Sequence, residues 1–142
     1  MSKSAEGLDA LRAMAGAARA RAYAPYSNYQ VGAALRTASG RYYSGCNVEN
    51  SAYPEGTCAE AGAIAQMVLA GDRTIAEVVV VGPPGRPCTP CGGCRQKIRE
   101  FAGPHTPVHV CNPYELLLTT TIGELLPVAF GPEHVGLSAD DG

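Results

Sequence analysis

Apolar residues recur every three to four positions in three parts of the chain, and this spacing predicts amphipathic helices. The predicted helices are Glu6–Ala22, Thr57–Ala70 and a third that begins at Cys91 or Gly92 and ends near Phe101. The first helix must stop before Pro25, because a proline ring disfavours helical geometry in the residue that precedes it. Gly71 stands at the position where the second helix is expected to stop.

Strand patterns separate these helices. The predicted strands are Tyr29–Arg36, Arg41–Val48, Glu77–Val81, Pro107–Cys111 and Tyr114–Thr119. The first two flank Thr37–Gly40, where a glycine suits the positive φ of a tight turn, so they predict a β-hairpin. The valine-rich run Glu77–Val81 is typical of a strand covered on both faces, so we place it at the centre of its sheet. A helical turn is expected over Ile122–Leu126.

This order of elements predicts an α/β fold, a three-layer α/β/α sandwich with a mixed five-stranded sheet. The chain has 142 residues, of which 46% are hydrophobic and 17% charged, so it can bury a core of its own. We found no internal repeat and no linker-like segment. We therefore expect residues 1–142 to form a single domain, in which the last part, from about residue 133 to residue 142, is a frayed tail.

The charge balance argues against a nucleic-acid partner, since 11 Lys and Arg face 13 Asp and Glu and the net charge is -2. No stretch approaches the roughly 18 apolar residues of a membrane span, and the beginning of the chain lacks the pattern of a signal peptide. We expect a cytoplasmic protein that binds neither nucleic acid nor membrane. In that setting its six cysteines are expected to serve metal binding, catalysis or burial rather than disulfides.

The clearest chemical motif is the sequence PCGGC at Pro90–Cys94. Two cysteines three positions apart on the first turn of a helix can direct both sulfurs to one metal ion. A helix amino terminus also stabilises negative charge, so we expect both thiols to lose their protons more readily than free cysteine. Alone, this motif also fits a redox pair or half of a structural zinc site.

A second segment supplies what a catalytic site needs in addition. Cys58 begins another predicted helix, 33 residues before Cys91. Three thiolates would leave the fourth tetrahedral position of zinc for a water molecule, whose pKa the metal lowers toward ~7. Glu60, two residues after Cys58, can take a proton from that water and pass it to a leaving group. These groups suit hydrolytic attack on an unsaturated carbon, as in zinc nucleobase deaminases.

Motifs along most of the chain resemble those of a known family. They are APYSNY at Ala24–Tyr29, VGAAL at Val31–Leu35, GCNVEN at Gly45–Asn50, CAE at Cys58–Glu60, PCGGCRQ at Pro90–Gln96 and ELLP at Glu124–Pro127. In this order, between about Ala18 and Phe130, they resemble the short, homotetrameric cytidine deaminases. The resemblance implies zinc-dependent hydrolysis of cytidine and deoxycytidine to uridine and deoxyuridine, with release of ammonia, in pyrimidine salvage.

The resemblance also implies roles for individual residues. It implies one Zn²⁺ per chain, bound by Cys58, Cys91 and Cys94, and proton transfer by Glu60. The substrate-binding residues it implies are Asn47 and Glu49 for the ribose, Tyr29 and Ala59 in the nucleoside pocket, and Phe130. Many relatives carry Phe at the position of Tyr29. Phe130 is expected to reach the base in a neighbouring subunit of a homotetramer.

The chemistry of the residues agrees with some of these roles. Asn47 and Glu49 lie two positions apart, so on a strand both side chains point to one face, where an amide and a carboxylate can bind a diol. Without the zinc motif the same residues would fit a polar strand end. Phe130 lies in a short segment bounded by Pro and Gly, outside any predicted element, although a Phe there could also cover the core of its own chain.

One position departs from the family pattern. Many relatives continue Cys-Ala-Glu with Arg, whose guanidinium can hydrogen-bond the zinc thiolates, whereas this chain has Ala61. Donors around a metal site reduce the negative charge on its ligands. We expect the difference to affect metal affinity and rate more than the class of reaction.

Alternatives to the expected site and function stay open at this stage. Cys88 could replace a ligand, although Pro90 favours extended structure and so places Cys88 off the helical turn. A deaminase of another small base-bearing molecule, such as a modified nucleoside or a blasticidin-like antibiotic, would have the same catalytic core. A non-catalytic zinc or thiol module would explain the two neighbouring cysteines but leave Glu60 without a role.

Overall fold

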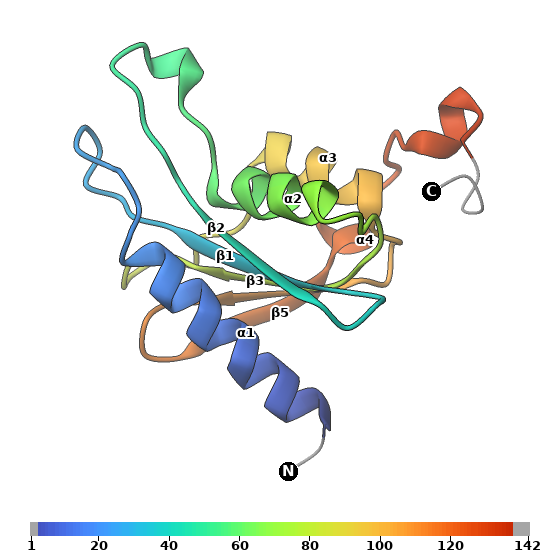
Figure 1. The fold of residues 1–142 in the computed structure, drawn as a ribbon, viewed down its shortest axis with the longest axis horizontal. Coiled ribbons are helices and arrows are strands. Elements are labelled where there is room, and N and C mark those ends of the chain that lie inside the picture. Colours follow the sequence, from blue (N-terminus) through green and yellow to red (C-terminus); the bar gives the residue numbers. More distant parts are fainter. Residues whose placement is uncertain (1–2, 138–142) are drawn as a thin grey trace.

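The computed structural model describes residues 3–137, which form a five-stranded sheet with helices on both faces (Figure 1). The strands are β1 (Gly32–Thr37), β2 (Tyr42–Cys46), β3 (Ile75–Val81), β4 (Pro107–Cys111) and β5 (Leu116–Thr121). Their order in the sheet is β2-β1-β3-β4-β5, and only β3 and β4 run parallel. The predicted mixed sheet, with the valine-rich strand at its centre, is confirmed.

The helices form the outer layers. They are α1 (Lys3–Arg19), α2 (Ala59–Leu69), α3 (Gly92–Phe101) and α4 (Ile122–Leu125), with two 3₁₀ turns, η1 (Tyr53–Glu55) and η2 (Pro132–Val135). Figure 1 shows α1 on one face of the sheet and α2 and α3 on the other. The three-layer arrangement predicted from the sequence is therefore present. No helix within residues 3–137 is long and apolar enough to cross a membrane.

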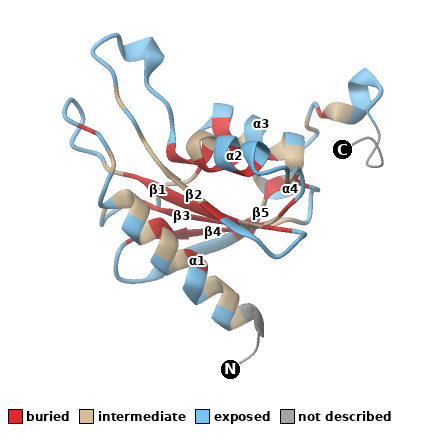
Figure 2. Cartoon of the chain, viewed as in Figure 1, coloured by how far each residue is buried: buried red, intermediate tan, exposed pale blue. Residues whose placement is uncertain are grey.

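The central strand β3 is buried on both faces, which explains its continuous run of valines (Figure 2). On one face Val78 and Val80 belong to the core beneath α2 and α3, together with buried Met67 and Ile98. On the other face Val79 and Val81 pack with Leu11 of α1. Because helices pack on both faces of β3, the end of this strand at Val81 is fixed, and the segment that connects it to α3 starts from a defined position.

The start of α2 lies directly on the sheet because β2 contains Gly45 at the contact. A Cβ atom at this position would lie 2.4 Å from the backbone nitrogen of Ala63 and 2.5 Å from the carbonyl oxygen of Ala59. Both distances are far below van der Waals contact, so no larger side chain fits without moving the helix. This glycine therefore sets the height of the first turn of α2 above the sheet.

Several predicted element boundaries differ from the structure by a few residues, and in two of these cases hydrogen bonds to other segments explain the difference. Helix α1 ends at Arg19 instead of Ala22, because Tyr23 pairs with the chain after β2: its N–H donates to the carbonyl oxygen of Asn47 at 3.0 Å. The last strand begins at Leu116 instead of Tyr114. The side-chain oxygen of Asn112 accepts hydrogen bonds from two backbone N–H groups of that turn, at 2.7 and 2.8 Å.

The expected tail is helical over its first described part. Pro132–Val135 form η2, and Arg99 of α3 forms an ion pair with Glu133, with 2.6 Å between Nη2 and Oε1. This long-range contact joins residues that no local sequence pattern connects. The remainder of the expected tail, from residue 138 onward, lies outside the described residues.

Candidate active site

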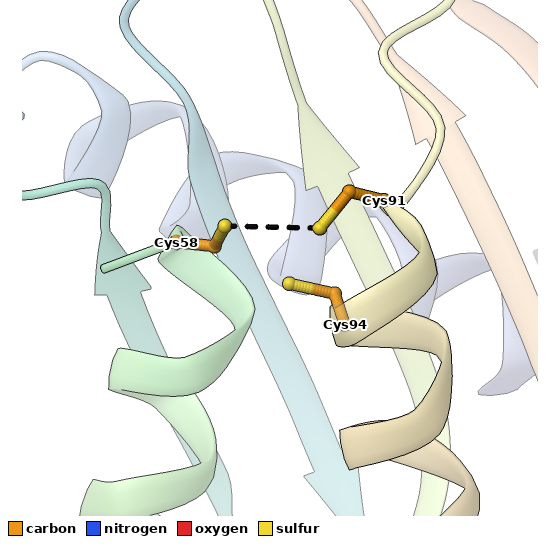
Figure 3. Close-up of side chains that lie close together, drawn as sticks. All are labelled: Cys58, Cys91 and Cys94. Atoms are coloured by element: carbon orange, nitrogen blue, oxygen red, sulfur yellow. Dashed lines mark hydrogen bonds between the residues drawn. The ribbon is translucent and has the colours of Figure 1, made fainter. Parts of the chain in front are cut away.

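Three cysteine sulfurs meet where α2 and α3 begin (Figure 3). Cys58 and Cys91 are the N-cap residues of the two helices, and Cys94 lies in the first turn of α3. The Sγ atoms of Cys58 and Cys91 are 3.9 Å apart, and all three Sγ atoms lie within 4.8 Å of one another. Sulfurs at ~2.3 Å from a tetrahedral zinc ion would be about 3.8 Å apart. The three expected ligands are thus brought together in a geometry that fits zinc.

The expectation of easily deprotonated thiols holds for one cysteine of the pair and is wrong for the other. The backbone N–H of Cys94 donates a hydrogen bond to Cys91 and lowers the pKa of the Cys91 thiol. Burial raises the pKa of Cys94, and burial likewise raises the pKa of Cys58. Zinc must therefore displace protons from thiols whose pKa is raised, which makes metal affinity dependent on pH.

Glu60 lies beside the three sulfurs, on the first turn of α2. Its side chain is almost completely buried, with 5% of the residue exposed, and this burial raises the pKa of the carboxyl. The carboxyl also forms a hydrogen bond with the thiol of Cys94. A carboxyl group in such a place, close to a metal site but with a raised pKa, is suited to accept and return a proton.

A cavity of about 430 Å³ opens above these groups. The predicted site residues that line it are Tyr29, Asn47, Glu49, Cys58, Ala59, Glu60 and Cys91. They come from the loop before β1, the segment after β2 and the starts of two helices. The structure therefore brings two of the expected metal ligands, the expected proton carrier and the expected sugar-binding side chains to a single cavity.

Asn47 and Glu49 line this cavity from an irregular extended segment, because β2 ends at Cys46 and not at Val48 as predicted. The side chain of Asn47 bridges two backbone groups: Oδ1 accepts from the N–H of Val31 and Nδ2 donates to the carbonyl oxygen of Tyr29, both at 2.8 Å. These bonds fix the amide and also hold the chain that enters β1.

Glu49 is held by a residue that the sequence analysis did not single out, Ser27. One carboxylate oxygen of Glu49 accepts from the backbone N–H groups of Tyr26 and Ser27, at 3.0 and 3.1 Å, and the other accepts from the Ser27 hydroxyl. These donors lower the pKa of Glu49, the Ser27 hydroxyl most strongly. Ser27 lies within the motif Ala24–Tyr29, but the sequence did not show that its hydroxyl faces a residue 22 positions away.

Tyr29 and Cys88 meet on the wall of the cavity. Burial raises the pKa of Tyr29 to about 12, and a hydrogen bond to the Cys88 thiol adds to this, so the phenol is neutral near pH 7. Cys88 precedes α3 and is not part of the sulfur cluster. The expectation that Cys88 lies off the helical turn is confirmed, and its place is in the pocket instead.

Phe130 is not among the residues that line the cavity of its own chain. It lies between α4 and η2 and remains 59% exposed. The alternative in which Phe130 covers its own core is therefore wrong, because such a role would require burial.

Comparison with known proteins agrees with the geometry of the site. Residues 6–110 match the family described as the cytidine and deoxycytidylate deaminase zinc-binding region, and this range contains Glu60 and all three clustered cysteines. The chain belongs to this deaminase family. This chain is 43% identical to a curated relative, a cytidine deaminase of Sporosarcina psychrophila, over 87% of this chain and 90% of that protein. A cytidine deaminase of Mycobacterium tuberculosis is 38% identical over 85% and 87% of the two chains.

Solved structures extend the comparison to three dimensions. The crystal structure of a cytidine deaminase from Burkholderia pseudomallei superposes on the deaminase with a TM-score of 0.82 and 43% identity, covering 92% of this chain and 100% of that one. A cytidine deaminase from Mycobacterium tuberculosis superposes with a TM-score of 0.74 and 36% identity, covering 87% and 97%. The likeness therefore extends over most of the chain.

Proposed function

We propose that this protein is a zinc-dependent cytidine deaminase, which hydrolyses cytidine and deoxycytidine to uridine and deoxyuridine and releases ammonia. The observation that carries the proposal is the single cavity that joins a zinc-type thiol cluster, a buried acid and two oriented polar side chains. The names and coverage of the relatives support it. The product class fits a role in pyrimidine salvage.

Cys58, Cys91 and Cys94 would hold one Zn²⁺ through their sulfurs. When bound, the metal supplies Lewis acidity that activates a water molecule for attack on C4 of the cytosine ring. Glu60 would take one proton from the attacking water and deliver it to N3, and would then take the proton of the new C4 hydroxyl and deliver it to the exocyclic amine. The C4 carbonyl forms as the C4–N bond breaks, and the amine leaves as ammonia. The raised pKa of this buried carboxyl helps it hold a proton between the two transfers.

Asn47 and Glu49 have hydrogen-bonding capacity left for a sugar. A primary amide offers two donors and two lone pairs, and Asn47 uses one of each for the backbone. A carboxylate accepts about four hydrogen bonds, of which Glu49 uses three. Both side chains are already fixed before substrate arrives, which favours binding of the ribose hydroxyls because little freedom is lost.

Ala59 and Tyr29 complete the proposed nucleoside pocket. Ala59 is the first residue of α2, so its backbone N–H has no partner within the helix and is available to the base. Ala59 as a whole is buried, and it lines the cavity. Tyr29 contributes its ring and a neutral hydroxyl.

The active unit in this proposal is a homotetramer in which Phe130 covers the base in a neighbouring subunit. Phe130 is exposed, does not line the cavity of its own chain and is not packed in the core of that chain. A second hollow, lined in part by exposed Tyr26 and Tyr53, adjoins the substrate cavity and shares Ser27 and Glu49 with it. An aromatic residue of another copy fits such a surface.

The cysteines bear on the compartment. All six are free thiols, a state that a reducing compartment such as the cytoplasm maintains.

The metal assignment is tested by single replacements: Cys91→Ala is expected to abolish zinc binding and activity, and Cys88→Ala to retain zinc. Zinc retention in Cys91→Ala together with loss in Cys88→Ala would show that Cys88 is the ligand.

Ammonia release from a panel of substrates tests the function itself. Zinc-loaded protein is expected to deaminate cytidine and deoxycytidine, and free cytosine far more slowly. Equal rates with cytosine and cytidine would overturn the assignment of Asn47 and Glu49 to the ribose. Preference for a modified nucleoside or a blasticidin-like antibiotic would identify a deaminase of another substrate. Absence of ammonia with every substrate, with zinc bound, would favour a non-catalytic zinc module.

A further inference from the structure

The segment that contains Phe130 is fastened to α3 by side chains for which the deamination chemistry has no use. The Nε2 group of Gln96 donates a hydrogen bond to the carbonyl oxygen of Phe130 at 2.9 Å. Three positions further along the helix, the Arg99 guanidinium forms its 2.6 Å ion pair with Glu133. Residues three apart on a helix lie on the same side. The helix thus holds the segment at two points, one on each side of Gly131.

The ring of Phe130 is itself held in one orientation. It stacks on the ring of His134, with 4.8 Å between the ring centroids and 23° between the planes. The Nδ1 atom of His134 accepts a hydrogen bond from the backbone N–H of Gly131 at 3.0 Å, which fixes the imidazole. One face of the phenyl ring is therefore covered, and the residue is still 59% exposed.

The backbone between these contacts is also closely fitted. A Cβ atom at Gly131 would lie 2.6 Å from a carboxylate oxygen of Glu133 and 2.9 Å from the guanidinium carbon of Arg99. The chain therefore passes close over the ion pair, and a side chain at Gly131 would require the ends of Glu133 and Arg99 to move. Upstream, Val128 has a φ of 51° and is fully exposed, a conformation that is costly for a β-branched residue.

These contacts order an apolar side chain without burying it in the core of its own chain. Fixing a side chain costs conformational entropy, and an exposed aromatic ring returns little hydrophobic stabilisation. The same ordering is useful when the ring is to be bound elsewhere, since a group fixed in advance loses less freedom on binding. Figure 1 shows the segment extending away from the sheet beyond α3 and α4, where another subunit can reach it.

We propose that Gln96, Arg99 and Glu133 are positioning residues for the active site of a neighbouring subunit, because they hold Phe130 in the orientation in which it covers the bound base. The inference rests on the proposed homotetrameric deaminase and adds these three residues to it. Helix α3 then serves two sites: Cys91 and Cys94 at its start bind the metal of its own subunit, and its middle presents Phe130 to the next.

Steady-state kinetics of ion-pair variants provide the first test. Glu133→Ala is expected to raise KM for cytidine about three- to tenfold, with kcat within about twofold of the original and zinc content unchanged. Arg99→Glu and Glu133→Arg should each raise KM, and combining them should restore it. Glu100→Ala on the same helix is the matched control, since Glu100 is exposed, and its KM should not change. The restored double variant also provides a readout if a single variant folds poorly.

Mixed tetramers separate action on a neighbour from action within the chain. Glu133→Ala chains are co-expressed with an excess of Glu60→Gln chains, which lack the proton carrier but present an intact Phe130. The active sites of the Glu133→Ala chains should then recover a KM near that of the original protein. An excess of chains with both Glu60→Gln and Phe130→Ala should give no recovery.

The outcomes distinguish this inference from the proposed function. Unchanged KM in Glu133→Ala, or no recovery in the mixed tetramers, would overturn the positioning role while leaving an active deaminase. A wild-type protein that releases no ammonia from cytidine would overturn the proposed function, and the positioning role with it.

Discussion

Glu60 and Glu49 line the same cavity, but their surroundings shift their pKa values in opposite directions. Burial raises the pKa of Glu60, which favours its protonated form. Hydrogen bonds from the Ser27 hydroxyl and from two backbone N–H groups lower the pKa of Glu49, which stays ionised as an acceptor. Two carboxyl groups separated in this way are suited to different tasks, one to proton transfer and the other to binding hydroxyl groups.

Replacing the proposed proton carrier tests the first of these tasks. Glu60→Gln should retain zinc and bind cytidine with a similar KM, because the amide has nearly the same shape and the thiols are intact. Its turnover should fall by at least the ~100-fold that general acid-base catalysis commonly contributes. Zinc analysis and ammonia release measure both effects. Turnover equal to that of the original protein would exclude the mechanism, and loss of zinc would make Glu60 a ligand.

Ser27→Ala tests the second task through its effect on Glu49. Without its strongest donor, the pKa of Glu49 should rise toward the ordinary value of 4.5. Because the folded-state pKa is lowered, the stabilisation from this contact is present above the ordinary pKa and is lost as the pH falls through the lowered value. In the variant that loss should be smaller and should be complete at a higher pH, because the folded-state pKa lies closer to the ordinary value.

Carboxyl NMR titration of Ser27→Ala measures the change in pKa, and kinetics should show a higher KM for cytidine at unchanged zinc content. Ser51→Ala, at an exposed position, is the control. An unchanged Glu49 pKa in Ser27→Ala would show that the two backbone N–H groups alone hold the carboxylate.

At the scale of elements, the sequence predicted the features that depend on a regular spacing of apolar residues or on residue types with a specific chemistry. The 3.6-residue periodicity located α2 and α3, the valine run located the centre of the sheet, and the cysteines at both helix starts predicted the cluster of three sulfurs. It could not predict contacts between distant segments. The end of β2 before Asn47, the hydroxyl of Ser27 on Glu49 and the ion pair that organises η2 all depend on which chain segments meet in space.

The position of α2 on the sheet leads to a prediction about Gly45. An alanine there would place its Cβ against the backbone of Ala59 and Ala63, at the helix start that holds Cys58 and Glu60. Overpacking of this kind typically costs about 1–3 kcal/mol of stability, and the displaced helix should bind zinc more weakly.

Gly62 is a matched control for this substitution, since it lies on the other side of the same contact. Its added Cβ would meet its nearest neighbour at 3.5 Å, an ordinary contact, and alanine is favoured in a helix. The free energy of unfolding, measured with urea, and the affinity for zinc should therefore both fall for Gly45→Ala. Both should stay equal or increase for Gly62→Ala. Equal behaviour of the two variants would show that α2 adjusts freely and does not depend on close approach.

At the scale of the whole molecule, a single chain leaves the substrate cavity without the aromatic side chain of Phe130. The residues that line it supply metal ligands, a proton carrier and polar contacts, but Phe130 of the same chain lies elsewhere. A cavity completed by a neighbouring copy would make catalysis depend on assembly. The unit that binds cytidine would then be the oligomer and not the single chain.

Assembly and the effect of Phe130 can be measured together. Sedimentation should show a species of about four times 14.7 kDa. Phe130→Ala should remain a tetramer with its zinc in place, since the residue touches neither the thiols nor the core of its own chain. Removing a stacked ring worth roughly 1 kcal/mol beyond its burial should raise KM for cytidine at least about fivefold. Within its own chain Phe130 contacts the ring of His134 and is largely exposed. The increase in KM should therefore come from the contact between subunits and appear only in the assembled enzyme. A monomer with full activity, or a tetramer in which Phe130→Ala leaves KM unchanged, would contradict a site shared between subunits.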